Sequence, residues 1–457
     1  MNTTTHHDPI EVPATREARW VEILLWIFMA SFALDYRNAE AREAGAGAGL
    51  DQLVFLAAAI SSTAGILFIG WRHLLVRPGA WFVLGWGGFL AFMAANSLLQ
   101  GVDPGRSVRI ILPLCLCLAG IMNAHIAGCV GLRPSRIVMP VFAAACTNII
   151  WRIVQGLVFK GVSFDDVRTQ VQSAANNWLA AWIGCALLLR PRFHPLLPVG
   201  IGILFFGIFI TVTRSLLFPV MASATAAGFC FILGNRWGIY QPMDAVKRLL
   251  PISVLGALAV AAVGIAFVLN PQKIATWNER LFHQASDRNV TEDISYTTRH
   301  AEADGIFEIL NREPVHYLYG RGIGATYHWH SKYMPEIRLV YPPNEEMGED
   351  IWFAGHSTWT YSLFSGGVIG LLAYVTLIGG VMTASISAAR ANASDPGPDQ
   401  WLAFLPFIAA CCLLSESLTS NPFDERLSAM IFGVMAGLSQ SFLVRASWIH
   451  AGRASLA

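Results

Sequence analysis

Repeated long apolar runs constrain the fold of this chain more than any other feature. A helix that crosses a bilayer needs roughly 20 predominantly apolar residues, and a run of about 18 or more indicates such a helix. The chain has about twelve runs of this kind, at residues 19–36, 51–71, 79–100, 107–128, 136–159, 174–190, 195–212, 215–234, 250–269, 357–386, 400–418 and 428–447. The sequence therefore predicts an all-α polytopic membrane protein.

Composition agrees with this fold class and excludes others. Of the 457 residues, 54% are hydrophobic and 13% are charged, whereas roughly 25% of the residues of a soluble domain are charged. The formal net charge is only +1, and a nucleic-acid-binding protein would show a concentrated basic face. We therefore expect membrane lipids, and no nucleic acid, as partners. All eight cysteines lie in or beside apolar runs, so we expect them to act as small buried apolar residues.

One long polar segment, residues 270–355, interrupts the apolar runs. It divides the chain into a first part with nine predicted transmembrane helices (1–269), the polar segment itself, and a last part with three predicted helices (356–457). A polar segment of this length is too long for a simple connection between helices. We therefore expect it to carry part of the functional site.

Basic residues in the short connections predict the orientation, because cytoplasmic loops carry an excess of Lys and Arg. The connections on one side are richer in basic residues, namely Arg16, Arg19, Arg72, Arg77, Arg133, Arg136, Arg190, Arg192, Arg236, Lys247, Arg248, Arg390, Arg445 and Arg453. If this side is cytoplasmic, both termini are inside and the polar segment is outside. Arg214, in the tight connection between the seventh and eighth helices, and His356, at the start of the tenth, then lie at the same outer surface.

The polar segment itself is predicted to be partly helical. Thr297 and Thr298 can cap a helix from about Arg299 to Leu310, and Ile306, Phe307 and Leu310 recur at helical spacing to give it an apolar face. Pro314 marks its end. The sequence Gly320-Arg-Gly-Ile-Gly324 then predicts a turn rather than a dinucleotide-binding loop, because no βαβ pattern surrounds it.

His356 is the candidate catalytic residue. It stands where a transmembrane helix begins, so backbone N–H groups and the positive end of the helix dipole lie next to it. A positive field keeps an imidazole neutral, and a neutral imidazole can act as a general base. The alternative is a histidine that only caps the helix at the membrane interface.

Four arginines are candidates for binding a phosphate group, because the planar guanidinium matches phosphate oxygens with two parallel donors. Arg214 lies within an apolar hairpin, where a lone charge is costly and usually functional, although it can also extend to the lipid headgroups. Arg299 lies on the predicted helix of the polar segment and Arg321 between two glycines, and either can be simply solvated. Arg152 lies near the end of an apolar run and is a weaker candidate.

A metal site is an alternative use of the polar segment. His328 and His330 have the spacing H-x-H, and acids follow downstream at Glu345, Glu346, Glu349 and Asp350. Imidazole and carboxylate groups could together bind a divalent cation. This spacing is common by chance, so we expect no metal and no other cofactor.

Taken together, three stretches make the chain resemble the O-antigen ligase/polymerase superfamily, membrane glycosyltransferases of the GT-C type. The stretches are Thr211-Val-Thr-Arg214-Ser215, then Thr298-Arg299 with Pro314 and Gly320-x-Gly322-x-Gly324, and last His356 with Leu363-Phe-Ser-Gly366-Gly367-Val-Ile-Gly370. Their order and the long outer segment late in the chain also agree. The chain departs from the family pattern at Ser357, where Asn is frequent, and at Leu216, where Gly is frequent.

The resemblance implies an enzyme that uses an undecaprenyl-pyrophosphate-linked glycan as donor. For the ligase, the acceptor would be the lipid A–core and the location the bacterial inner membrane, with the site facing the periplasm. The resemblance further implies that Arg214 and Arg299 hold the pyrophosphate and that His356 activates the acceptor hydroxyl. Such a transfer would be metal-independent and would invert the anomeric centre.

Other functions remain open on the sequence. An O-antigen polymerase or a protein-glycan ligase would use the same donor with another acceptor. A transporter is the alternative from another class, because twelve helices are common among transporters. Transporters usually show repeated halves and broken helices, and the two halves of this sequence look unlike each other.

Overall fold

Apolar helices make up most of the protein, whose structure is a computed structural model. It describes residues 15–35, 49–159, 173–211, 216–241, 294–340, 351–393 and 397–454, together with isolated positions between 254 and 271. The apolar helices are α1 (Arg16–Ser31), α3 (Leu50–Gly70), α4 (Gly79–Leu99), α5 (Pro104–Cys129), α6 (Pro134–Val154), α8 (Ala175–Leu188), α9 (Leu197–Thr211), α10 (Leu217–Arg236), α16 (Thr358–Ala391), α17 (Leu405–Ser417) and α18 (Arg426–Ala454).

These helices confirm a multi-pass membrane protein. Among the described residues, eight helices are long and apolar enough to cross a bilayer. The helices at three further predicted spans, α1, α8 and α9, are shorter, with 16, 14 and 15 residues. The predicted span 250–269 falls almost wholly outside the described residues, so the count of twelve stays a prediction.

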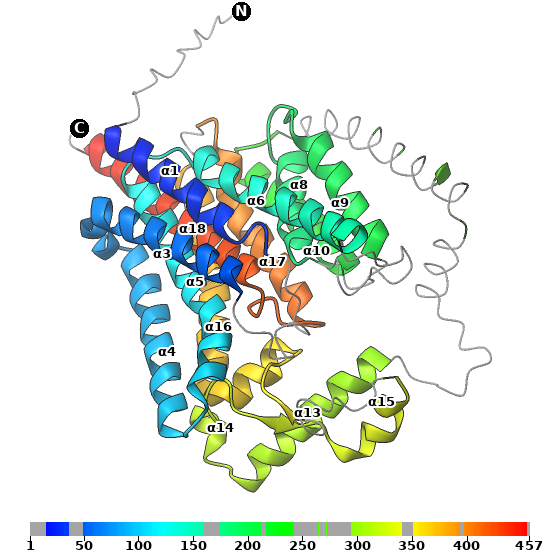
Figure 1. Cartoon of the computed structure of the whole chain (residues 1–457). Coiled ribbons are helices and arrows are strands. Elements are labelled where there is room, and N and C mark those ends of the chain that lie inside the picture. The colour runs from blue at the N-terminus through cyan, green and yellow to red at the C-terminus, as the bar shows by residue number, and fades with distance from the viewer. Residues whose placement is uncertain are drawn as a thin grey trace, which may run out of the picture.

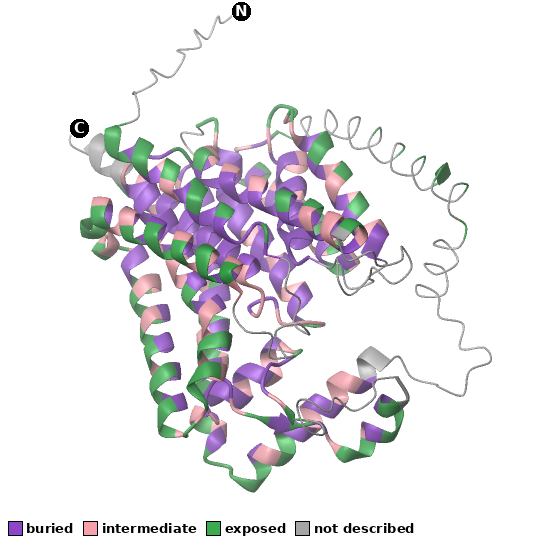
Figure 2. Ribbon diagram, viewed as in Figure 1, coloured by how far each residue is buried: buried purple, intermediate pink, exposed green. Residues whose placement is uncertain are grey.

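Helix α18 lies at the centre of the bundle, packed closely along α5 (Figure 2). Glycines permit this close approach: a Cβ at Gly120 of α5 would lie 2.6 Å from the carbonyl oxygen of Met430, and one at Gly437 of α18 would lie 2.5 Å from that of Ile121. Small residues at helix contacts are typical of membrane bundles, where van der Waals packing replaces the hydrophobic effect.

Polar contacts join helix ends on two opposite faces of the bundle. On one face Arg136 of α6 pairs with Glu22 of α1 at 2.8 Å, and Arg445 of α18 donates to the carbonyl of Leu132 at 2.5 Å. On the other face the Asn148 side chain donates to the carbonyl of Ala33 at 3.0 Å. The first face includes Arg136 and Arg445, two of the arginines from which the sequence predicts the cytoplasmic side, and the orientation stays a prediction.

The polar segment forms a small unit on the face opposite to the two chain ends (Figure 1). Its elements are α13 (Ile294–Arg312), α14 (His316–Tyr319), β1 (Tyr327–His328), the 3₁₀ turn η4 (Ser331–Tyr333), α15 (Met334–Val340) and β2 (Ile351–Trp352). The strands pair antiparallel, with Tyr327 opposite Trp352. This short ribbon is the one departure from an all-helical chain within the described residues.

The helix predicted in this segment exists, but its predicted start and part of its predicted face are wrong. α13 begins at Ile294, and Thr297, the expected cap, lies inside the helix with 1% of its surface exposed. Ile306 and Leu310 are fully buried, whereas Phe307 is 37% exposed because it lies beside rather than on the buried stripe.

The glycine turn docks against a kink in α16. Gly320, Gly322 and Gly324 all have positive φ, as the predicted turn requires, and Gly367 inside α16 has φ 63° and ψ −158°. The kink deprives the preceding carbonyls of their helical partners. The backbone N–H of Arg321 donates to the carbonyl of Phe364 at 2.8 Å, and that of Gly322 to the carbonyl of Ser365 at 3.0 Å. Backbone groups of the two glycine-rich motifs thus form hydrogen bonds with each other.

Candidate active site

A buried carboxylate holds the candidate catalytic histidine. Nδ1 of His356 lies 2.8 Å from Oε2 of Glu302 in α13, and the backbone N–H of His356 donates to both carboxylate oxygens at 3.0 Å. The backbone N–H of Ser357, the N-cap of α16, donates to Oε1 at 3.4 Å. One carboxylate therefore fixes both the backbone and the ring of His356.

The position of Glu302 follows from two helices. It lies four residues before Ile306 and eight before Leu310, so it belongs to the buried stripe of α13. The same stripe meets the N-terminus of α16, where free N–H groups and the helix dipole favour an anion. The sequence correctly predicts a positive field beside His356, but the structure adds a negative charge that offsets it.

The contact selects the tautomer of the histidine. A carboxylate accepts hydrogen bonds only, so the ring donates its Nδ1–H to Glu302, and Nε2 carries the lone pair. The His356 side chain is 44% exposed, whereas that of Glu302 is 1% exposed. This is the arrangement of a base that reaches substrate and a buried acid that orients it.

Two stacked tryptophans stand beside the histidine. The rings of Trp329 and Trp352 lie 4.6 Å apart with an interplanar angle of 9°. The His356 ring is 6.1 Å from the first and 5.9 Å from the second. Both indole Nε1 atoms are buried without a partner among the described residues. Trp352 is in β2 and Trp329 directly follows β1, so the pairing of the two strands brings the tryptophans together.

Arg299 belongs to the same site. It precedes Glu302 by three residues on α13, and residues three apart are neighbours on one face of a helix. Its side chain is partly exposed. Glu302 therefore contacts His356 directly and lies one helical turn from Arg299, and the shared role of Arg299 and His356 stays a prediction.

Arg321 lies in a different cluster. Its guanidinium pairs with Glu313 at 2.5 Å, and Nδ1 of His316 lies 3.0 Å from the same carboxylate. Because an acid already neutralises Arg321, its predicted phosphate contact would require that pair to open.

Arg152 is buried within the bundle. It is 5% exposed and pairs with Glu425 at 3.2 Å, and Glu425 also accepts from the backbone N–H of Ala174 at 3.2 Å. The connection that contains Glu425 reaches the start of α16, where Thr358 Oγ1 donates to the Asn421 side chain at 3.1 Å. Arg152 thus pairs with the same connection that contacts the start of α16, and its phosphate contact stays a prediction.

Two predictions concern residues that the structure does not describe. Arg214 lies outside the described residues, and so do Glu345, Glu346, Glu349 and Asp350. Among the described residues, no three His, Cys, Asp or Glu side chains come close enough to hold a metal ion. His328 is exposed, and His330 Nδ1 accepts from the backbone N–H of Lys332 at 3.2 Å.

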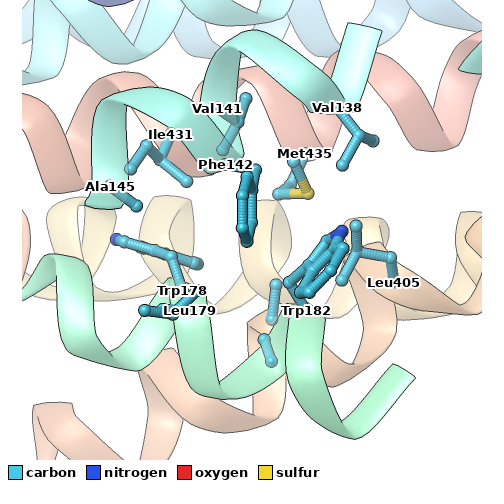
Figure 3. A pocket seen from close by; sticks show the side chains of 12 residues that line it. Val138, Val141, Phe142, Ala145, Trp178, Leu179, Trp182, Leu405, Ile431 and Met435 are labelled. Carbon is cyan, nitrogen blue, oxygen red and sulfur yellow. The ribbon is translucent and has the colours of Figure 1, made fainter. Parts of the chain in front are cut away.

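An apolar cavity inside the bundle is separate from this site. It lies between α6, α8, α17 and α18 and is lined by side chains such as Phe142, Trp178, Trp182 and Met435 (Figure 3). Its volume is about 10 Å³, near the smallest space that holds one water molecule. It carries no group that could act on a substrate.

Sequence reasoning missed Glu302 and the tryptophan pair. The sequence does contain a signal for Glu302. Glu302, Ile306 and Leu310 follow one another at intervals of four residues, so an acid lies on an otherwise apolar face of the helix. Buried acids need partners, and such a position is a functional candidate. The pairing of Trp329 with Trp352 had no such signal, because the strands are only two residues long.

Comparison with known proteins gives no independent assignment. No family model matches the chain, and no curated protein sequence matches it.

Proposed function

We propose that the protein is an O-antigen ligase, a glycosyltransferase of the bacterial inner membrane. It would transfer a preassembled glycan from undecaprenyl pyrophosphate to the lipid A–core. Its site would face the periplasm and both termini the cytoplasm. The observation that carries the proposal is the exposed His356 ring, fixed through Nδ1 by the buried carboxylate of Glu302 at 2.8 Å.

The chemistry that this pair supports is the activation of a hydroxyl group. Nε2 of His356 takes the proton of the acceptor hydroxyl as its oxygen forms a bond to the anomeric carbon of the donor sugar. The bond between that carbon and the pyrophosphate oxygen breaks, and undecaprenyl pyrophosphate leaves with the electron pair. Glu302 stabilises the imidazolium that forms, as the acid of a catalytic triad does. One displacement of this kind inverts the anomeric centre.

Cationic groups would stabilise the departing pyrophosphate. Pyrophosphate needs no protonating acid, but the negative charge that develops on it is stabilised by positioned donors. Arg299 is the described residue best placed for this, one helical turn from Glu302. The resemblance to the O-antigen ligase/polymerase superfamily implies the same role for Arg214. Arg321 and Arg152 are paired with acids and contribute to the structure around the site.

The tryptophan pair supports a sugar as the substrate. Aromatic faces stack on apolar surfaces, and indole N–H groups donate hydrogen bonds. The Trp352 ring lies 5.9 Å from the His356 ring, close to where an acceptor sugar would present its hydroxyl. The buried N–H groups of both indoles lack a partner, and each such group costs about 1–3 kcal/mol. A sugar oxygen reached by a small ring rotation would satisfy one of them.

A transfer assay with purified components tests the proposal. The full-length protein in lipid nanodiscs should convert lipid A–core to the glycan-bearing product in the presence of undecaprenyl-pyrophosphate-linked glycan. A deletion strain should accumulate polymerised, lipid-linked glycan. Loss of polymerised glycan from that strain would instead assign the protein as a polymerase. Absence of transfer to any glycan or peptide acceptor would remove the enzymatic proposal.

A further inference from the structure

The segment that follows α13 is bonded to the ends of membrane helices. The Asn96 side chain of α4 donates to the carbonyl of Tyr319 at 2.7 Å. Ser97 accepts from the backbone N–H of Ile323 at 2.8 Å, and Ser107 of α5 donates to the carbonyl of the same residue at 2.9 Å. These helices are apolar enough to cross a bilayer. The segment is therefore attached within the last turn of α4 and the first turn of α5, and not above them.

The kink of α16 gives the depth of this attachment. A Cβ at Gly366 would lie 2.9 Å from Sδ of Met93, and one at Gly367 would overlap the backbone of Leu318 and Tyr319. Met93 precedes Leu99, the last residue of α4, by six positions, and a helix rises about 1.5 Å per residue. Gly366 thus lies up to about 9 Å inside the end of α4, and Tyr319, which accepts from Asn96, lies up to about 5 Å inside it. Figure 1 shows α14 level with that end of α4.

Irregular backbone is tolerated at membrane depth only where protein or water satisfies its polar groups. This segment meets the condition. The N–H groups of Arg321 and Gly322 donate to α16, that of Gly324 donates to the Tyr361 hydroxyl at 3.2 Å, and the carbonyls of Tyr319 and Ile323 accept from α4 and α5.

The outward side of the segment is apolar. Val315 is 56% exposed and Leu318 is 60% exposed, whereas His316 between them is buried. The neighbouring end of α4 exposes Leu98 at 71% and Leu99 at 85%. Lipid-facing surfaces of membrane helices carry such side chains. The charged groups beside this surface, Arg321 and Glu313, are paired with each other.

We infer that residues 314–324 form a re-entrant segment whose helix α14 lies in the outer leaflet against lipid acyl chains. The partner of this surface is the membrane lipid itself. Because α13 ends at Arg312, immediately before the segment, the immersion of α14 holds α13 and Glu302 at the membrane surface. The inference does not depend on the enzymatic activity.

Accessibility of spin labels tests this placement directly. Single cysteines at Val315 and Leu318 would be labelled with a nitroxide in the full-length chain, with Cys115 and Cys411, the cysteines that are not buried, changed to serine. The protein would be measured in phospholipid nanodiscs. Oxygen partitions into the bilayer and a nickel chelate into water. Leu99 serves as the lipid-facing control, and Glu336, exposed on α15, serves as the water-facing control.

Both labels should be several-fold more accessible to oxygen than to nickel, and their ratio should match that of Leu99. A ratio at either position that matches Glu336 overturns the inference. This result would leave the proposed transfer reaction untouched, and loss of transfer activity in the assay above would leave the re-entrant placement untouched.

Discussion

Glu302 and His356 are 54 positions apart in the sequence, yet their side chains meet at 2.8 Å. The carboxylate also accepts the backbone N–H groups at the start of α16. The orientation of the His356 ring and the capping of the N-terminus of α16 therefore depend on the same carboxylate. This double use distinguishes Glu302 from the other acids of α13: Asp304 accepts from the Tyr333 hydroxyl, and Glu308 is exposed and paired with Arg312.

Replacing Glu302 tests the orientation of the base. Glu302→Gln keeps the shape of the side chain but removes its charge, so it neither selects the Nδ1–H tautomer nor stabilises the imidazolium. We expect transfer to slow by about 10²–10⁴-fold, measured as kcat in nanodiscs. The matched control is Glu308→Gln, on the same helix but exposed and paired with Arg312, which should retain full activity. Equal loss in both variants would exclude a specific role for Glu302.

Removing the imidazole tests the base itself. His356→Ala should lower kcat by about 10²–10⁴-fold, while binding of the lipid-linked donor, measured by scintillation proximity, stays unchanged. His330→Ala is the control, because His330 lies on the same unit and bonds only within the polar segment among the described contacts. Wild-type activity of the His356 variant would remove the proposed mechanism.

Arg299 is expected to act on the donor and not on the acceptor. Arg299→Ala should raise the donor KM by about 10- to 100-fold, since a hydrogen bond to a charged group contributes roughly 1.5–3 kcal/mol. Arg299→Lys should restore only part of this loss because lysine lacks the planar fork. Arg312→Ala, on the same helix but 73% exposed, is the control. An unchanged donor KM in the alanine variant contradicts the phosphate role.

Trp352 is expected to affect the acceptor. Trp352→Ala should raise the acceptor KM by about 2- to 10-fold, the effect of losing an aromatic contact of roughly 0.5–1.5 kcal/mol, with little change in the donor KM. Trp352→Phe should keep most of the stacking. Trp20→Ala, at an exposed position on α1, controls for general effects on the protein. A change confined to the donor would assign the pair to the other substrate.

Gly367 tests the kink of α16. Gly367→Ala places a side chain at positive φ and against the backbone of Leu318, and strain of this kind costs about 1–3 kcal/mol. Its melting temperature in detergent should fall. Gly379→Ala on the same helix meets open space and should stabilise the protein by about 0.5–1 kcal/mol. Equal melting temperatures for the two variants would show that the kink is not strained by a Cβ.

The sequence predicts the membrane helices well because hydrophobicity over about 20 residues is a local property. It also predicts the glycine turn, whose glycines have positive φ. His356 and Arg299 carry local signals too, and their functional roles stay predictions. It does not predict the partner of His356, because contact between α13 and α16 depends on how the kink and the glycine turn fit. The predicted start of α13 is wrong for a related reason. Tertiary packing buries Thr297 inside the helix and overrides its preference for an N-cap position.

The contact between the glycine turn and α16 is made by main chain on both sides. No side chain separates Gly320 from Ser365 or Gly367 from Leu318, so no substitution can adjust their spacing gradually. The turn and the outer part of α16 must then shift as one body, carrying His356 with them. In the proposed transfer reaction, any opening that admits the two substrates would then occur at the borders of this body, where it meets the remaining helices.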